Sequence, residues 1–476
     1  MQRARFNPRK HKPVRTQHPV LGELELDKRL AQQKGVRYKS WAKVAKGWYG
    51  NTGISRPHIE FVRKPRETYL LLKKLAEHPT PENIRKINRI YQDRIQSCTQ
   101  TLSRVFGIRN PQVVFESNGT MALAFLRGLT GAEGKTVLHT TDMGRIVERA
   151  LQGEDTSRTK EDFKQPIGLF SHAGALKEEK ISTVHTMDLY TKKDTPKTDT
   201  EICRELFSEI QRQRPALVIV PQISRSGRRL PVKRIGKFVK EFNQKTGSKI
   251  IFVVDGAQTI GRVSAEEMQN PLEYCDAYML VGQKALGAMI SAAVVLKPGL
   301  VEANANNLLQ SSIAARLSRY QFAQPVPKLE AFLKKESNHY AVSLPEIESL
   351  DLALQALETR GRGTTFSQRR LHQVKRMQAL QKTLVSKLNQ VRGIKVLQAE
   401  PQTPRTHSIV TFTLTKSAGM TAEEFRNRLQ ELDSPITLAP LYQRPVLRIG
   451  LSELREQNLD YLVQSIKKIL TKGKHA

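Results

Sequence analysis

A lysine and an aspartate stand where their side chains could do chemistry together. Lys284 lies between glycines in "GQKALG", shortly after the apolar stretch "AYMLV". A lysine at the mouth of a buried sheet loses hydration, which lowers its pKa and favours the neutral amine. A neutral amine can form a Schiff base with an aldehyde. Lys284 is therefore the first candidate for a catalytic residue.

Asp255 is the second candidate, because it ends the apolar run "IIFVV". A carboxylate that faces a pyridine nitrogen keeps that nitrogen protonated, so the ring draws electrons from the α-carbon of a bound amine. Taken singly, a lysine after a strand is an ordinary surface residue and an aspartate there is an ordinary helix cap. Placed after consecutive strands, Lys284 and Asp255 together predict a site for pyridoxal phosphate (PLP).

A phosphate group needs accessible backbone amides, such as those at a helix N-terminus. The segment "FESNGTMALAFL" predicts a strand, then Ser117, Asn118, Gly119 and Thr120, and then a helix. Gly119 allows close approach of the backbone, and Thr120 offers a hydroxyl group. The alternative interpretation is an ordinary turn and helix cap.

Strands and helices alternate through the middle of the chain, from "QVVFES" to "SAAVVLK". Short, continuously apolar strands that alternate with helices predict an α/β fold, a mostly parallel sheet sandwiched by helices. Ligands of such sheets bind at the carboxyl ends of the strands. Ser117, Ser224 and Asp255 all fall at such ends.

The chain of 476 residues is too long for one ordinary core. Residues 1–45 are expected to form a basic, disordered arm. A large PLP-binding domain is expected over 46–340, with the segment 46–77 packing near the small domain. A smaller α+β domain with an antiparallel sheet is expected over 341–476, and it begins with one long helical stretch that runs to about Leu388.

Composition sets the function classes that remain open. The formal net charge is +33, and basic side chains release counterions when they neutralise phosphates, so nucleic acid or another acidic surface is a possible partner. The positive residues are spread along the chain, which favours the plainer reading of a solvated surface. No apolar run has the roughly 20 residues that a bilayer crossing needs.

The three cysteines are Cys98, Cys203 and Cys275, and they show neither a disulfide framework nor metal-binding spacing. This use of cysteine fits a reducing cytoplasm. The beginning of the sequence lacks the apolar core of a secretory signal. We therefore expect a cytoplasmic protein without membrane contact.

From about Trp48 to the C-terminus, the chain resembles the class V aminotransferase family of PLP-dependent enzymes (fold type I). The segments that carry the resemblance are "FVVDGAQTIGRV", "LVGQKALG", "ISRSGRRLPVKRI", "SLPEIESLDLALQAL" and "VLRIGLSELREQNLDYLVQSI". The front half, with "WYGNTGISRP" and "VVFESNGTMAL", is most similar to the isopenicillin-N-epimerase-like branch.

The resemblance implies a role for individual positions. Lys284 forms the Schiff base with PLP, and Asp255 pairs with its ring nitrogen. Gln258 reaches the phenolic oxygen. Further positions bind the cofactor or the substrate. The remaining cofactor contacts that the resemblance implies are Asn118, Gly119, Thr120, Met143, Ser224 and Gln283. The implied substrate contacts are Asn51 and Arg448, whose guanidinium would bind the substrate α-carboxylate through two hydrogen bonds.

Some positions depart from the family pattern. Gln283 and Val281 stand where the family often has His and Ser or Thr, and Met143 stands where a ring-stacking His is usual. Ser224 replaces an Asn. The spacing from Asp255 to Lys284 is slightly longer than the family pattern. These departures indicate an unusual substrate, or a weakened or lost cofactor site.

Two hypotheses follow. The first is a PLP-dependent enzyme that acts on an amino acid or amine, as an aminotransferase or lyase, and as a homodimer, the assembly that the resemblance implies. A desulfurase is not expected, because such enzymes use a cysteine in the small domain and all three cysteines precede Lys284. The second is a non-catalytic protein of the same fold that binds nucleic acid or an acidic partner.

Overall fold

The computed structural model describes residues 60–116, 119–132, 135–140, 183–191, 196–289, 291–310, 321–322, 344–397, 408–432, 438–441, 446–451 and 456–472. The expected arm at 1–45 and the expected domain boundary near 340 lie outside these residues. Both stay predictions.

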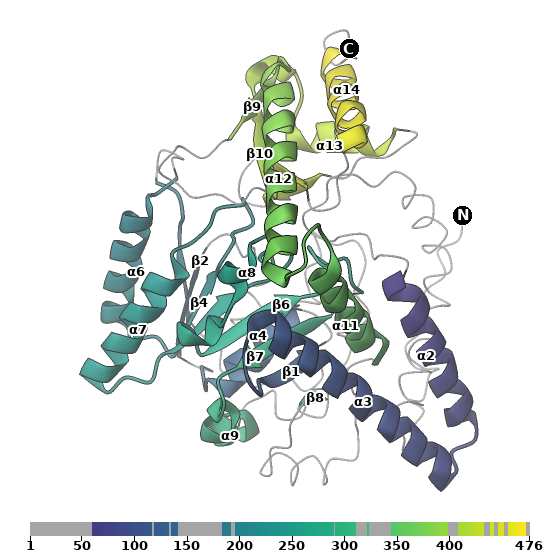
Figure 1. The fold of residues 1–476 in the computed structure, drawn as a ribbon. Helices are drawn as coiled ribbons and strands as arrows, with labels where there is room; N and C mark the ends of the chain where they lie inside the picture. Colours follow the sequence, from purple (N-terminus) through teal and green to yellow (C-terminus); the bar gives the residue numbers. More distant parts are fainter. Residues whose placement is uncertain are drawn as a thin grey trace, which may run out of the picture.

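A large sheet forms the centre of the molecule (Figure 1). Its strand order is β3-β2-β4-β5-β6-β7-β1-β8. Strands β2 to β6 run parallel, and β7 is antiparallel to both of its neighbours. The strand bounds are β1 Gln112–Glu116, β2 Thr136–Thr140, β3 Thr183–Met187, β4 Leu217–Pro221, β5 Ile251–Asp255, β6 Ala277–Val281, β7 Ala292–Leu296 and β8 Gln321–Phe322.

Helices cover both faces of this sheet. The helices described in this part of the chain are α2 Glu60–Glu77, α3 Pro81–Phe106, α4 Gly119–Leu129, α6 Asp199–Gln213, α7 Val232–Thr246, α8 Ala265–Met268, α9 Leu300–Gln310 and α11 Leu344–Thr359. One buried apolar cluster joins α3, α6, α7 and α11 to the sheet, and another joins α4 and α9 to its other face. In β4, Val218 and Val220 enter the first cluster and Leu217 and Ile219 the second, which explains why the strand is apolar throughout.

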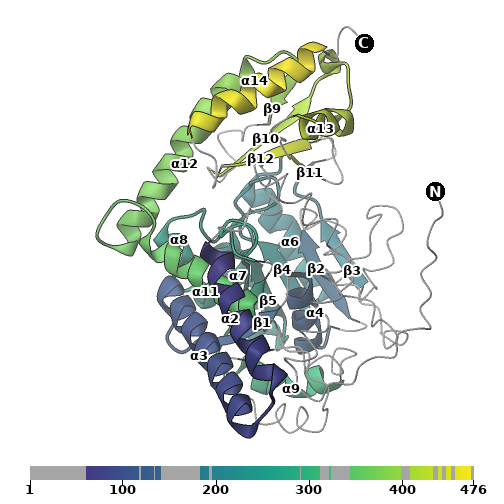
Figure 2. The same cartoon turned by 90° about the vertical axis from the view of Figure 1, so that its right-hand side faces the viewer.

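A second, smaller sheet lies at one end of the molecule (Figures 1 and 2). It has the order β11-β12-β10-β9, and all of its described pairs are antiparallel. Its elements are α12 Phe366–Asn389, β9 Ile394–Val396, β10 Ile409–Leu414, α13 Ala422–Gln430, β11 Ala439–Leu441, β12 Val446–Gly450 and α14 Glu456–Lys472. The long α12 runs from the large sheet to this unit, and it packs with α13 and α14 in a separate core. The expected fold class, α/β with a smaller α+β unit, is confirmed.

Local signals set the helix ends. The Oγ1 of Thr80 accepts a hydrogen bond from the Asn83 amide at 3.2 Å, Pro81 opens α3, and Gly107 ends it at φ +65°. The expectation of one continuous helix to Leu388 is wrong. The chain breaks between α11 and α12, where Gly361 and Gly363 adopt φ of +109° and +130°, which are unfavourable for residues with a Cβ.

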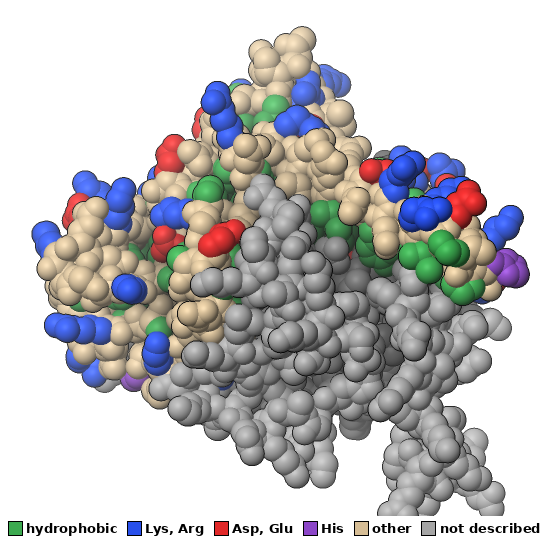
Figure 3. Space-filling view, turned by 90° about the horizontal axis from the view of Figure 1, so that it is seen from below, with side chains coloured by type: hydrophobic (Ala, Val, Ile, Leu, Met, Phe, Trp, Pro, Cys, Tyr) green, Lys and Arg blue, Asp and Glu red, His purple; other side chains and the backbone are tan. Residues whose placement is uncertain are grey.

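None of the helices in the described part of the chain combines the length and apolar character that crossing a membrane requires. Lysine and arginine side chains are scattered among acidic ones over the described part of the face in Figure 3, and they do not gather in one patch there.

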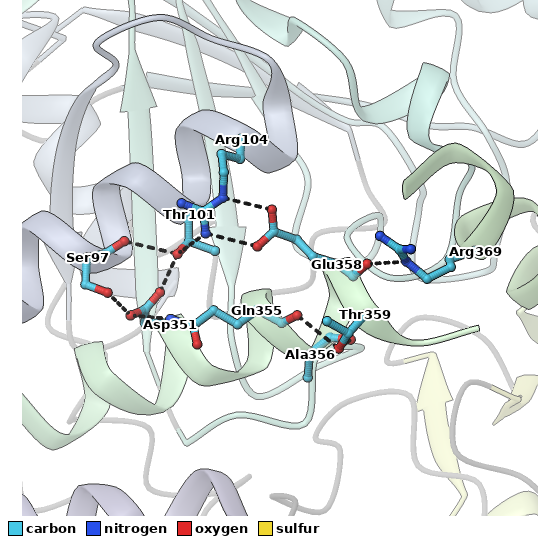
Figure 4. A network of polar contacts seen from close by, with 9 residues as sticks. All are labelled: Ser97, Thr101, Arg104, Asp351, Gln355, Ala356, Glu358, Thr359 and Arg369. Atoms are coloured by element: carbon cyan, nitrogen blue, oxygen red, sulfur yellow. Dashed lines mark hydrogen bonds and ion pairs between the residues drawn. The ribbon is translucent and has the colours of Figure 1, made fainter. Parts of the chain in front are cut away.

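A polar network joins α3 to α11 (Figure 4). The Asp351 carboxylate, which is 4% exposed, accepts hydrogen bonds from Ser97 Oγ at 2.6 Å and Thr101 Oγ1 at 2.7 Å. Nearer the surface, Arg104 and Glu358 form an ion pair at 3.0 Å. The buried carboxylate should matter more for stability, because its loss removes an acceptor from the buried Thr101 hydroxyl and from the partly buried Ser97 hydroxyl.

We expect Asp351→Ala to lower the free energy of unfolding by about 2–4 kcal/mol, since it removes a buried carboxylate that accepts hydrogen bonds from Thr101 and Ser97. Glu358→Ala, the matched control, should cost less than about 1 kcal/mol, as is usual for an exposed pair. Urea unfolding followed by circular dichroism measures both. Equal losses in the two variants would contradict this ranking.

Candidate functional site

The carboxyl ends of three parallel strands meet at the edge of the large sheet where Asp255 lies. Asp255 pairs with Pro221 of β4 on one side and with Met279 of β6 on the other. Its Oδ1 accepts a hydrogen bond from the Ala257 amide at 2.8 Å. A Cβ on Gly256 would lie 2.2 Å from the Tyr278 ring, so the turn after Asp255 requires glycine. The carboxylate is thereby held at the strand end.

The loop between β6 and β7 carries Lys284. The Gly282 amide donates to the Ser291 carbonyl at 2.9 Å, and a Cβ on Gly282 would meet Ser291 Oγ at 2.3 Å. The Met289 amide donates to Ser349 Oγ of α11 at 2.9 Å. Helix α11 is in turn fixed to α3 by the network in Figure 4. The loop is therefore supported by a helix from outside the sheet.

Four charged groups and its own burial determine the electrostatics of Lys284. Its pKa is lowered to about 8, chiefly by burial and also by the charges of Arg225, Arg448 and Arg262, and the charge of Asp255 partly offsets this fall. Lys284 keeps some exposed surface, yet burial dominates its pKa. The neutral fraction of the amine near pH 7 is consequently much larger than that of an ordinary lysine, which favours nucleophilic attack on an aldehyde.

The pKa of Asp255 shifts upward in the environment that lowers the pKa of Lys284. Burial raises its pKa, and the charge of Lys284 and the hydrogen bond from the Ala257 amide partly offset this rise. Among the contacts of the described residues, no hydrogen bond or ion pair joins the Asp255 and Lys284 side chains directly. Their charges act on one another through space, and a further cation facing Asp255 would relieve the cost of its burial.

The smaller sheet contributes Arg448, which lies on β12 and is completely buried. Its Nη1 donates to the carbonyl oxygen of Arg225 at 2.8 Å, and its charge acts on Lys284. Arg225 follows β4 in the turn that Gly227 closes at φ +85°. The structure thus brings the predicted arginine of the small unit to the predicted lysine of the large one.

Helix α4 begins at Gly119, within the segment that was predicted to join the strand to the helix, and its start lies against the end of β6. A Cβ on Gly119 would come within 3.0 Å of Val281 Cγ2. Val281 is the last residue of β6 and lies three residues before Lys284. The positive end of this helix is therefore directed at the same region as the lysine.

The other described candidates have specific partners. Gln258 is 4% exposed, and its Oε1 accepts from Arg262 Nη1. Gln283 Oε1 accepts from the Ser291 amide at 3.4 Å. Ser224 Oγ lies 2.9 Å from Ser226 Oγ and accepts a hydrogen bond from the Arg228 amide at 3.1 Å. These contacts of its hydroxyl group are therefore within its own turn.

Asn51, Asn118 and Met143 lie outside the described residues, and the side chain of Thr120 is not among those described. Their assigned contacts stay predictions.

Reasoning from the sequence missed four residues that shape this site. Arg225 lies inside a motif that had been noted, and Arg262 follows Gln258 by one turn, so their positions carried a signal. Ser349 and Arg370 support the site from α11 and α12, and no local pattern indicates which loop they reach.

The described residues fit PLP. A buried amine with a lowered pKa suits the aldehyde, and a buried carboxylate with a raised pKa suits a protonated ring nitrogen. The start of α4, together with the charges of Arg225 and Arg262, suits a phosphate. Arg448 suits the carboxylate of a substrate.

No protein-family model matches the chain, and no curated protein matches it in sequence. Many solved structures are similar in fold, and three of them illustrate the likeness. Alanine–glyoxylate aminotransferase from Nostoc sp. is 16% identical with a TM-score of 0.55, covering 89% of this chain and 95% of that chain. A cysteine desulfurase from Thermococcus onnurineus is 13% identical with a TM-score of 0.59, covering 90% and 95%. A C-DES mutant with glycine covalently linked to its PLP cofactor is 15% identical with a TM-score of 0.60, covering 89% and 96%.

At these identities the shared property is the fold. The expected resemblance to class V aminotransferase-like enzymes of fold type I is confirmed at that level. None of these three structures is described as a nucleic-acid-binding protein.

The electrostatic coupling predicts a measurable shift in Lys284. Asp255→Asn removes the negative charge that raises the pKa of Lys284, so this pKa should fall below about 8. Arg448→Met removes a positive charge, so the pKa of Lys284 should rise. The pH dependence of lysine modification in the cofactor-free protein, followed by peptide mass, measures both. The exposed Lys240 of α7 serves as an internal control and should react alike in every variant. Unchanged Lys284 profiles in both variants would refute the coupling.

Proposed function

We propose that this protein is a PLP-dependent enzyme that acts on an amino acid or amine as an aminotransferase or lyase of the class V kind. The observation that supports this most directly is the pairing of Lys284 and Asp255 at one sheet edge. Burial lowers the pKa of the amine to about 8 and raises that of the carboxyl. Perturbed pairs of this kind are typical of catalytic sites.

PLP would supply an aldehyde for the substrate amine and a ring that withdraws electrons from the α-carbon. Lys284 Nζ, with a pKa lowered to about 8, can accept a proton from that α-carbon and return one. The Asp255 carboxylate would hold a proton on the ring nitrogen. Lys284 would thus move a proton to and from the α-carbon, whereas Asp255 would keep a proton in place on the ring nitrogen.

Substrate orientation falls to Arg448. Its Nη1 is bonded to the Arg225 carbonyl oxygen, which fixes the plane of the guanidinium. A planar fork that is fixed in this way can hold a carboxylate through two hydrogen bonds. Because Arg448 comes from the smaller sheet and Lys284 from the loop after β6, the substrate would lie between the two units.

The remaining assignments rest on the resemblance. Gly119 and the adjoining Asn118 and Thr120 would hold the phosphate, and Gln258 the phenolic oxygen. Gln283, Ser224 and Met143 would complete the cofactor shell, and Asn51 would contact the substrate. A homodimer and a cytoplasmic location are likewise inferences from the resemblance and from the use of cysteine. Light scattering of the purified protein tests the homodimer.

Cysteine chemistry is not part of the proposal, although a cysteine desulfurase shares the fold. Cys98, Cys203 and Cys275 are at most 1% exposed, and burial raises the pKa of each thiol. A nucleophilic cysteine needs an accessible thiolate. We therefore favour transamination or lysis over sulfur transfer by a protein thiol.

The decisive experiment is cofactor binding. Wild-type protein mixed with PLP should turn yellow, and borohydride should attach the cofactor irreversibly to the peptide that contains Lys284. Lys284→Arg keeps the positive charge but removes the attacking amine, so it should give neither the colour nor the attached mass. A screen of amino acids for spectral change then identifies the substrate.

Wild-type protein that takes up no PLP would refute the proposed function. Attachment of the cofactor to a different lysine in the wild type would refute the assignment of Lys284.

The thiols give an independent prediction. We expect none of the three cysteines to react quickly with Ellman's reagent in the folded protein, and all three to react after denaturation in guanidinium, because all are buried. A thiol that reacts rapidly in the native state would reopen the desulfurase assignment.

A further inference from the structure

Arg262 and Gln258 form a buried pair beside Lys284. Arg262 is 2% exposed and Gln258 is 4% exposed, and Arg262 Nη1 donates a hydrogen bond to Gln258 Oε1. Both residues belong to the turn that follows Asp255. A buried guanidinium that donates to an amide oxygen is a charge-assisted hydrogen bond, which is stronger than a neutral one.

The backbone on both sides of Arg262 is held by a residue from another helix. Arg370 of α12 is 2% exposed, and its Nη2 donates to the Gly261 carbonyl at 2.7 Å and to the Val263 carbonyl at 3.3 Å. Gly261 adopts φ +85°, a conformation in which glycine is favoured. The turn that presents Arg262 is thus fixed from outside.

The charge of Arg262 reaches Lys284. Three guanidinium groups, those of Arg225, Arg448 and Arg262, lower the pKa of the lysine, and the carboxylate of Asp255 raises it. Arg262 therefore lies close enough to the amine to influence it electrostatically.

We propose that Arg262 is a positioning residue, which fixes the amide of Gln258 and so determines that this side chain offers an N–H donor to the cofactor. The oxygen and nitrogen of a terminal amide point in different directions. With the oxygen directed at Arg262, the NH2 group faces away from it. This inference rests on the proposed function, because the acceptor of that N–H would be the phenolic oxygen of PLP.

The role explains a feature that the sequence leaves open. A glutamine amide can rotate by 180° and exchange donor for acceptor. An acceptor pointed at a phenolic oxygen that carries negative charge would repel it. Arg262 offers donors only, so it can bond to the oxygen end of the amide and not to the NH2 end. The arginine therefore selects the orientation.

A double-mutant cycle on PLP affinity tests the proposal. Gln258→Ala and Arg262→Met should each weaken PLP binding by about tenfold, the effect of one hydrogen bond to a charged group. The double variant should bind about as weakly as either single variant, because Arg262 acts through Gln258. If the two losses multiply instead, Arg262 acts independently, for example on the phosphate, and the proposal fails.

A conservative variant and a surface variant serve as controls. Arg262→Lys keeps a charged donor and should restore part of the affinity that Arg262→Met loses. Arg234→Met removes an exposed arginine of α7 and should bind PLP as the wild type does. If Arg262→Lys restores no affinity and Arg234→Met also weakens PLP binding, the effect comes from overall positive charge, and the proposal fails.

The cofactor-free protein gives a second readout. Arg262→Met should raise the pKa of Lys284 by about half a unit or more, since a positive charge is removed from a partly buried site. Gln258→Ala, which removes no charge, should leave that pKa unchanged. If Arg262→Met lowers only the melting temperature and leaves both the pKa and the PLP affinity at wild-type values, its role is structural and the proposal fails.

These outcomes separate the two proposals. If the wild type binds no PLP, the proposed function fails and the cofactor role of Arg262 fails with it. If the wild type binds PLP and the cycle is additive, the proposed function stands and the positioning role alone is wrong.

Discussion

The burial of charge at the carboxyl edge of the large sheet is the constraint on which the site depends. Lys284 and three arginines would repel one another in a medium of low polarity, and Asp255 is the acid that acts on the lysine. Such an arrangement is costly unless anions enter it. A phosphate and a substrate carboxylate are anions of the kind that would stabilise it, and the start of α4 faces the same region. The cost of this excess positive charge is thus the physical reason for expecting anionic ligands here.

The supports of this edge come from outside the sheet. Ser349 on α11 accepts from the loop that carries Lys284, Arg370 on α12 holds the turn that carries Arg262, and Arg448 on β12 reaches the turn after β4. Each support belongs to an element C-terminal to the large sheet. The turns that carry Arg262 and Arg225 are therefore held by α12 and by the smaller sheet, whereas the loop that carries Lys284 is held by α11, which packs on the large sheet.

Much of this could be predicted from the sequence. The apolar strands, the alternation with helices, the strand-end residue Asp255 and a helix start close to Gly119 follow from local patterns. The break between α11 and α12 was missed, because the apolar pattern was followed through Gly361 and Gly363, although paired glycines mark such breaks. The long-range contacts of Arg448, Ser349 and Arg370 could not be derived, since no local pattern reveals which loop a distant side chain meets.

The difference between local patterns and contacts that only the structure shows also explains why the departures from the family pattern did not decide the function. A substituted residue such as Ser224 is judged by what its side chain contacts, and its hydroxyl serves its own turn. Gln283 bonds to the backbone of its own loop. Meanwhile Arg225 and Arg262, which no motif singled out, bring two positive charges to Lys284. The predicted cofactor shell departs from the family pattern in composition, yet the described arginines bring positive charge to Lys284, and positive charge of this kind favours an anionic cofactor.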